Sequence, residues 1–289
     1  MDSPENAGAD SVRERFARAA RAERPDLALL CLLVGAEADP AVRAEGGKGA
    51  DALVDAAQIE LDRLTGLLPY APSRTPAQWA HALAELLGGR HGFHGTPADY
   101  RRLESSLLSE VLRRRRGLPI LLSVVWMEVA RRAGAPVYGV ALPGHFVVGF
   151  GDPRGEHVLA DPFAGGLPLT GQDVELLVAG TAGAPLSEAM FQPAGPVEIV
   201  LRVLNNIRAW AAARPEHTDV QLWAVELSLL LPHHPARLRY ERARLLVERG
   251  DFVGGAREME AYADMVAAME PNAAVAVRRE ARAARSRLN

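Results

Sequence analysis

The stretch from Gly117 to Phe163 constrains the fold of this chain more than any other segment does. It opens with Ile120 to Arg132, which is apolar on nearly every face and therefore predicts a buried helix rather than a surface helix. Gly134 and Pro136 end this helix, because glycine is favoured just past a helix and proline cannot continue one. The apolar runs that follow are separated by turn residues and predict strands over 137–142, 145–150 and 156–160. The stretch therefore predicts a small antiparallel sheet packed on a central helix.

The regions on either side have helical periodicity, with start and stop residues typical of helices. Thr75, Pro76 and Gln78 have the spacing of a capping box. Gly88-Gly89 is expected to end that helix, and Gly46–Gly49 is expected to form a loop. The predicted helices cover 12–34 with a break at Pro25, 51–68, 76–87, 100–116, 170–178, 197–213, 219–230, 236–249, 254–268 and 272–287.

These elements predict an α+β protein with three parts. Residues 1–12 form a disordered N-terminus, residues 13–195 form a helical lobe with the central helix and sheet, and residues 196–289 form a helical tail. Within the tail, residues 238–265 resemble one tetratricopeptide unit, with a helix, a Gly-Asp turn and a second helix that begins with small residues.

Composition excludes several classes of protein. The chain has 289 residues, 48% hydrophobic and 24% charged, with a net charge of −3, so no basic field recruits nucleic acid or an anionic membrane. The one cysteine, Cys31, excludes an intrachain disulfide and a cysteine-only zinc site. The N-terminal residues have no apolar signal-peptide region, and Leu27–Val34 is too short to span a bilayer. These features favour a cytoplasmic location.

His145 and Asp161 are the residues best placed for chemistry. Both are predicted on adjacent strands, beside the start of the central helix. A carboxylate beside an imidazole fixes its tautomer, as a general base requires, and a helix start offers free N–H groups to an oxyanion. The alternative is that His145 is a hydrogen-bonded structural residue and that Asp161-Pro162 is a turn.

Six segments carry a specific combination of motifs in order: HGFHGTPADY (91–100), SSLLSEVLRRRRGLPILLSVVWMEVARRAG (105–134), LPGHFVVGF (142–150), ADPFAGG (160–166), RVLNNIRAW (202–210) and the segment 239–251. In these segments, over roughly residues 85–265, the chain resembles the SirB-like branch of the transglutaminase-core superfamily, whose members have a tetratricopeptide-like tail.

This resemblance implies a transglutaminase-like, papain-like core. In the wider superfamily the catalytic triad is Cys, His and Asp, and the resemblance places His145 and Asp161 at the last two positions. The position of the cysteine falls near Pro119, and the SirB-like branch generally has Gly-hydrophobic-Pro there too. The chain departs from its branch at Ser105, where an asparagine is usual. The resemblance therefore implies the fold without the thiol chemistry.

Four other residues are candidates for the site. Ser123 lies one turn beyond Pro119 and is a weak alternative nucleophile, although a serine in a buried helix usually bonds to a carbonyl of its own helix. Glu128 interrupts the apolar helix and needs a partner, for which Arg102 or the run Arg113–Arg116 is expected. Pro119, Glu128 and Phe163 are expected to line a binding cleft.

A metal site of Glu128, His145 and Asp161 is not supported by any tight ligand spacing, so no metal and no cofactor are predicted. The run Arg113–Arg116 is either a solvated helix end or a patch for an acidic partner. Cys31 is expected to be a small core residue.

Two functions remain open. The first is a transglutaminase-fold protein without the catalytic cysteine, acting as a regulatory or protein-interaction module on a protein or peptide partner. The alternative is a hydrolase or acyl transferase acting on amide or ester bonds, in which His145 is the base, Asp161 orients it, and water or Ser123 is the nucleophile.

Overall fold

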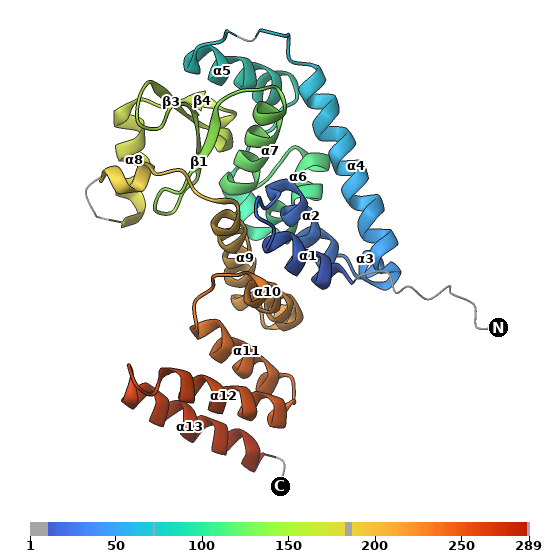
Figure 1. The fold of residues 1–289 in the computed structure, drawn as a ribbon, viewed down its shortest axis with the longest axis vertical. Coiled ribbons are helices and arrows are strands. Elements are labelled where there is room, and N and C mark those ends of the chain that lie inside the picture. The colour runs from blue at the N-terminus through green and yellow to red at the C-terminus, as the bar shows by residue number, and fades with distance from the viewer. Residues whose placement is uncertain (1–10, 72, 183–186, 288–289) are drawn as a thin grey trace, which may run out of the picture. The chain divides into compact units, whose positions relative to one another are not determined.

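The computed structural model describes residues 11–71, 73–182 and 187–287, and the chain divides into two compact units, Met1–Val203 and Leu204–Asn289 (Figure 1). The N-terminal segment predicted to be disordered lies outside the described residues as far as residue 10. Ser11 is described and caps the first helix, with Glu14 completing a capping box.

The first unit is mostly helical. Its α-helices are α1 (Val12–Ala20), α2 (Leu27–Ala38), α3 (Pro40–Glu45), α4 (Gly47–Gly66), α5 (Pro76–Leu83), α6 (Leu108–Arg114), α7 (Pro119–Arg132), α8 (Gly171–Ala182) and α9 (Pro196–Ala212), the last of which crosses the unit boundary. A π-helical turn, η1 (Ala84–Arg90), continues α5, and the shorter 3-10 turns are η2 (Pro97–Arg101), η3 (Leu103–Ser106), η4 (Pro162–Ala164) and η5 (Glu188–Phe191). The strands are β1 (Val137–Val140), β2 (Val147–Gly151), β3 (His157–Asp161) and β4 (Leu167–Pro168).

The four strands form one antiparallel sheet in the order β1-β2-β3-β4. Its two faces are covered by different helices. Val140, Val147 and Leu159 pack against α8 in a shared apolar cluster. Helices α5 and α7 also contact the strands but do not belong to that cluster. Figure 1 shows α7 between the sheet and the helices α2, α4 and α6, all of which it contacts.

Helix α7 is the centre of this unit, as its composition predicts. Every residue from Pro119 to Ala130 is buried, which explains why the segment is apolar on nearly every face. Pro119 occupies the first helical position, where its missing N–H costs no hydrogen bond within the helix.

Several predicted boundaries are wrong for tertiary reasons. Gly88-Gly89 does not end its helix, because a Cβ at Gly88 would lie 2.0 Å from the carbonyl oxygen of Gly165, so glycine serves close packing there. The expected loop at 46–49 shrinks to Gly46, since α4 already begins at Gly47. The helix expected over 100–116 is two 3-10 turns and α6. The buried carboxylate of Asp99 accepts hydrogen bonds from Thr96 and Ser105 and holds those turns.

The second unit continues with the 3-10 turn η6 (Pro215–His217) and the helices α10 (Thr218–Leu230), α11 (Arg237–Glu248), α12 (Phe252–Val266) and α13 (Pro271–Ser286). Consecutive helices α11, α12 and α13 pack on one another through small residues, as in tetratricopeptide arrays. Gly255 marks the closest approach, because a Cβ there would lie 2.5 Å from Val247. Among the described helices of either unit, none combines the length and apolarity needed to cross a lipid bilayer.

Candidate functional site

His145 and Asp161 form a hydrogen-bonded pair. Asp161 ends β3 as predicted, but His145 lies in the turn between β1 and β2, two residues before β2 begins, rather than on a strand. The turn bends at Gly144, whose φ of +69° favours glycine. The imidazole Nε2 lies 3.0 Å from Asp161 Oδ1, which also accepts the backbone N–H of Phe163 at 2.9 Å. The carboxylate is therefore held by two donors from different segments.

The pair is shielded from water, since the side chain of His145 is 10% exposed and that of Asp161 is 6% exposed. With Nε2–H donating to the carboxylate, Nδ1 carries the lone pair that could accept a proton. The bond at Nε2 is the only one that the imidazole makes within the described part of the chain. The hydrogen bond thus fixes the orientation of the imidazole.

Phe163 connects this pair to the start of α7. Its ring lies edge-on to His145, with ring centroids 6.0 Å apart. The same ring packs on Gly95, where a Cβ would lie 1.9 Å from Phe163 Cε2 and 2.8 Å from the Gly117 carbonyl oxygen. Gly95 N–H also donates to the Phe163 carbonyl at 2.9 Å. The imidazole, Phe163 and the residues just before Pro119 therefore lie together.

Tyr100 and Leu167 form an exposed rim beside the pair, and neither was singled out from the sequence. Tyr100 is 50% exposed and meets Phe163 edge-on at 6.0 Å, and Leu167 is 61% exposed and pairs with Asp161 across β3 and β4. Burial, and secondarily the charge of Asp161, raises the pKa of Tyr100. The signal available in the sequence was an aromatic residue directly after the turn residues of HGFHGTPAD.

Arg202 of α9 is a third residue that sequence reasoning missed. Its guanidinium donates to the Leu142 carbonyl at 3.0 Å and to the carbonyls of Ala141 and His145 at 3.5 Å. It also lies 5.8 Å from the centre of the Phe146 ring. Burial lowers the pKa of Arg202. Arg202 therefore clamps the turn that presents His145, although 57 residues separate the two positions in sequence.

No thiol lies at the start of α7, where Pro119 is buried. Cys31, the only cysteine, is buried on α2, and burial followed by the charge of Glu128 raises the pKa of its thiol. Ser123 is fully buried, and its hydroxyl donates to the carbonyl of Phe146 at 3.3 Å rather than to its own helix. Ser123 thus ties α7 to the residue after His145 and presents no free hydroxyl.

Glu128 lies apart from the pair, on the third turn of α7. Its expected partners are wrong, because its carboxylate bonds Arg131 at 2.6 Å and lies 3.7 Å from Arg132, in its own helix. Glu128 lies nine positions after Pro119 in α7, a rise of about 13 Å. Among the residues that the structure describes, no group of three His, Cys, Asp or Glu could hold a metal ion. Glu128 instead lines a separate cavity of about 410 Å³, with Asp26 and Tyr138.

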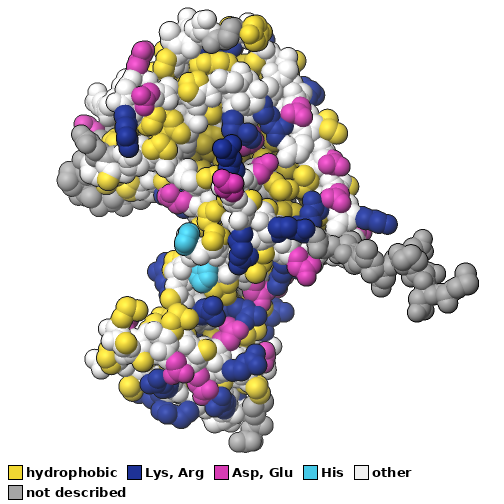
Figure 2. Space-filling model, viewed as in Figure 1, with side chains coloured by type: hydrophobic (Ala, Val, Ile, Leu, Met, Phe, Trp, Pro, Cys, Tyr) yellow, Lys and Arg dark blue, Asp and Glu magenta, His cyan; other side chains and the backbone are white. Residues whose placement is uncertain are grey.

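The arginine run Arg113–Arg116 is largely neutralised within the chain. Arg113 pairs with Glu110, Arg114 lies 3.8 Å from Asp99, and Arg115 pairs with Glu60. On the face drawn in Figure 2, basic and acidic side chains lie among one another over both units. The run is a paired helix end rather than an open cationic patch.

Comparison with known proteins agrees with this architecture. A family model described as "Transglutaminase-like superfamily" matches residues 50–205, and a "Tetratricopeptide repeat" model matches residues 207–289. A UPF0162 protein of Xylella fastidiosa (strain Temecula1) is 32% identical over 186 residues, which are 63% of this chain and 66% of that protein. A UPF0162 protein of Pseudomonas aeruginosa is 39% identical over 115 residues, 39% of this chain and 41% of that one.

F-box only protein 21 of Mus musculus is 26% identical over 183 residues, 60% of this chain and 28% of that protein. The chain therefore spans about two thirds of the length of the first of these relatives, and less of the other two. The UPF0162 relatives and the two family matches confirm the resemblance found in the sequence, both in the core and in the helical tail.

Proposed function

The chain belongs to the transglutaminase-like superfamily, and from that premise we propose that it acts as a regulatory or protein-interaction module rather than as a thiol enzyme. One observation carries the proposal. An oriented imidazole lies beside the start of α7, but Pro119 stands there and the only cysteine is buried on α2 with a raised pKa. A buried, protonated thiol is neither exposed to substrate nor nucleophilic. The His145–Asp161 pair then serves to fix the turn and the tip of the helix.

The second unit supplies a surface for a partner. Helices α9, α10 and α11 line a cavity of about 580 Å³, whose walls include Arg208, Arg237, Tyr240 and Arg244. Arg208 is neutralised by Glu241 at 2.5 Å, whereas Arg237 is exposed and forms no ion pair in the described part of the chain. Helical repeats of this kind offer hollowed surfaces that bind protein partners. This cavity is the interaction surface that the proposal assigns.

The chemical half of the proposal is tested with a panel of ester and amide substrates and the variants Cys31→Ala and His145→Ala. We expect no turnover above the uncatalysed rate for wild type or for either variant. A covalent thiol-reactive probe should label Cys31 only after unfolding. Turnover that disappears in Cys31→Ala would overturn the proposal.

The binding half is tested by affinity capture and crosslinking with the full chain, comparing wild type with Arg237→Glu/Arg244→Glu. The matched control is Arg279→Glu/Arg282→Glu, which makes the same charge change at exposed arginines of α13 outside the cavity. We expect the first variant, and not the control, to lose the captured partner. Equal capture by all three proteins would contradict the assignment of this surface.

The His145–Asp161 geometry keeps one second candidate, a hydrolase that uses water as its nucleophile. The observation that favours it is the Nδ1 atom of His145, which has no hydrogen-bond partner among the described residues. In the substrate panel, turnover lost in His145→Ala and kept in Cys31→Ala would select this candidate.

A further inference from the structure

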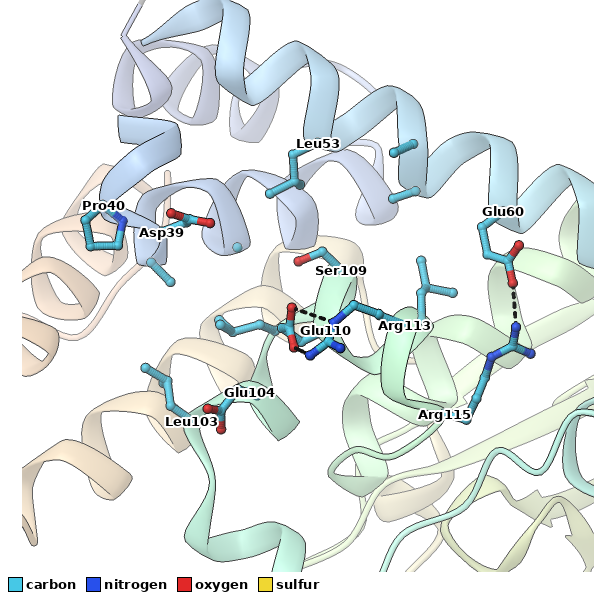
Figure 3. A pocket seen from close by; sticks show the side chains of 16 residues that line it. Asp39, Pro40, Leu53, Glu60, Leu103, Glu104, Ser109, Glu110, Arg113 and Arg115 are labelled. Atoms are coloured by element: carbon cyan, nitrogen blue, oxygen red, sulfur yellow. Dashed lines mark hydrogen bonds and ion pairs between the residues drawn. The ribbon is translucent and has the colours of Figure 1, made fainter. Parts of the chain in front are cut away.

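A cavity of about 830 Å³ opens in the first unit, and Arg113 and Arg115 of the arginine run line it (Figure 3). Its walls come from α2, α4, η3 and α6, with Pro40 at the start of α3. The volume lies in the upper part of the range of ligand-binding clefts, about 300–1,000 Å³. Neither His145 nor Asp161 lines it.

The apolar part of the lining, called the floor below, consists of small residues and leucines: Gly35, Ala38, Ala56, Ala57, Leu53, Leu103, Leu107 and Leu112. At its base α2 and α6 touch, because a Cβ at Gly35 would lie 3.1 Å from Ser109 Oγ. Such a floor has holes that match the protruding side chains of a helix.

The part of α4 that lines the cavity is long enough to contact a short helix along its side. Its lining residues 53, 56, 57 and 60 recur at the spacing of one helix face. Seven residues of helix rise by about 10 Å, so the cavity, which we call the trough, accepts about two turns of an added helix. Because its walls are helices whose backbone groups are already bonded, it offers no strand edge to an extended peptide.

The charges of the trough are unbalanced. Both of its arginines are paired within the wall, Arg113 with Glu110 at 2.6 Å and Arg115 with Glu60 at 2.8 Å. Asp39 and Glu104 are left over. The side chain of Asp39 accepts only backbone N–H groups, and the side chain of Glu104 forms no hydrogen bond or ion pair with the described residues, although its charge acts on Arg113.

These two carboxylates are both exposed and give the trough a residual negative charge. Figure 3 shows them on the side of the cavity away from the Arg115–Glu60 pair. The trough is therefore apolar along its floor and anionic at one end.

We propose that this trough binds an amphipathic helix of a partner protein, with an apolar stripe that fills the floor and lysine or arginine side chains at the end that meets Asp39 and Glu104. The negative charge disfavours a nucleic acid or an anionic membrane as the occupant. It also disfavours the first ten residues of the chain itself, which carry three carboxylates and no lysine or arginine. The inference goes beyond the function proposed above, because it concerns a surface of the first unit.

The test uses the full chain and two fluorescent helical peptides of about 15 residues, since shorter helices are marginal in water. Both peptides carry the same leucine and alanine stripe. One has lysines at one end, and the other has glutamates at those positions. We expect the lysine peptide to bind about tenfold more tightly in fluorescence anisotropy, and the difference to shrink as salt is added. Equal binding of the two peptides to wild type would overturn the proposal.

Two pairs of variants locate the binding. Ala56→Trp fills the trough from an exposed position, and Ala52→Trp makes the same change at an exposed position of α4 outside it. Asp39→Asn/Glu104→Gln removes the end charges and keeps an acceptor at the cap of α3, and Asp55→Asn/Glu156→Gln makes the same charge change elsewhere.

We expect Ala56→Trp to weaken the binding of the lysine peptide at least about tenfold and Ala52→Trp to leave its binding unchanged. The charge variant at the trough should remove the preference for lysine over glutamate, and its control should not. Equal effects of a variant and its control, or a dimer of the chain that only Ala56→Trp dissociates, would overturn the proposal. Should Ala56→Trp fail to fold, the charge variants alone decide. Arg237→Glu/Arg244→Glu should not change peptide binding, so failure here is distinct from failure of the proposed function.

Discussion

The side chain of Asp161 receives both the imidazole Nε2 of His145 and the backbone N–H of Phe163 on a single oxygen, Oδ1. One carboxylate oxygen thereby joins the β1–β2 turn to the turn that leaves β3. This bond holds the imidazole beside the start of α7, whether the site binds, catalyses or only supports the fold.

Replacing Asp161 should reveal how much this oxygen contributes. Asp161→Ala leaves two buried donors without a partner and should lower the free energy of unfolding by about 1–3 kcal/mol. Asp161→Asn keeps an acceptor at the same place and should cost less. Urea denaturation of the two variants measures the difference, and equal losses would show that the charge, not the acceptor, is what stabilises the turn.

The contact between Gly95 and Phe163 predicts a double-mutant coupling. Gly95→Ala places a methyl group inside the Phe163 ring position and should destabilise the protein by about 1–3 kcal/mol. Phe163→Ala should relieve part of that cost when the two are combined. Thermal unfolding of the four proteins in the cycle measures the coupling. Gly171→Ala, at a position with open space, is the control and should not show it.

We expect Arg202 to hold the turn that carries His145 in place. Arg202→Met removes the donors to three carbonyls, so the amides of residues 141–146 should exchange with solvent faster and the His145 ring signal should shift. Arg202→Lys should give exchange rates and a ring signal between those of wild type and Arg202→Met, because an ammonium does not match the fork of the guanidinium. NMR with hydrogen exchange measures both effects. An unchanged ring signal in Arg202→Met would show that the turn holds itself.

Because Cys31 is buried, we expect the protein to lose stability as the pH becomes alkaline. Burial raises the pKa of the folded thiol above its ordinary value, near 8.5, so above that pH the unfolded chain binds fewer protons than the folded one. The stabilisation is complete below the ordinary pKa and is lost as pH rises, by up to about 1.4 kcal/mol per pH unit. The difference between wild type and Cys31→Ala in chemical denaturation isolates this slope. Parallel pH profiles would contradict a buried thiol.

Removing either partner of the Glu128–Arg131 ion pair should lower the stability by a different amount. Arg131→Met leaves a buried carboxylate with only Arg132 at 3.7 Å and should cost about 1–2 kcal/mol, moderated by solvent around the exposed arginine. Glu128→Gln keeps an acceptor for Arg131 and should cost less than about 1 kcal/mol. Guanidinium denaturation compares them. A larger loss in Glu128→Gln would mean that the charge itself is required.

The sequence determined the features that depend on local pattern. The apolar faces of α7, the helices after Pro196 and the positions of the first three strands follow from periodicity and from turn residues within short windows, whereas β4 was not predicted. The absence of a thiol at the start of α7 needs no coordinates, because the chain has one cysteine and it lies elsewhere.

The contacts between distant segments came from the tertiary structure alone. It continued α5 through Gly88 because the backbone at Gly165 lies against it, and it moved His145 off the strand into a turn clamped by Arg202. It also gave Glu128 partners from its own helix and left Asp39 and Glu104 unneutralised at one end of a trough. Periodicity records which face of an element is buried, but not which segment covers it. Contacts between residues tens of positions apart are chosen by packing of the whole fold, which no local window contains.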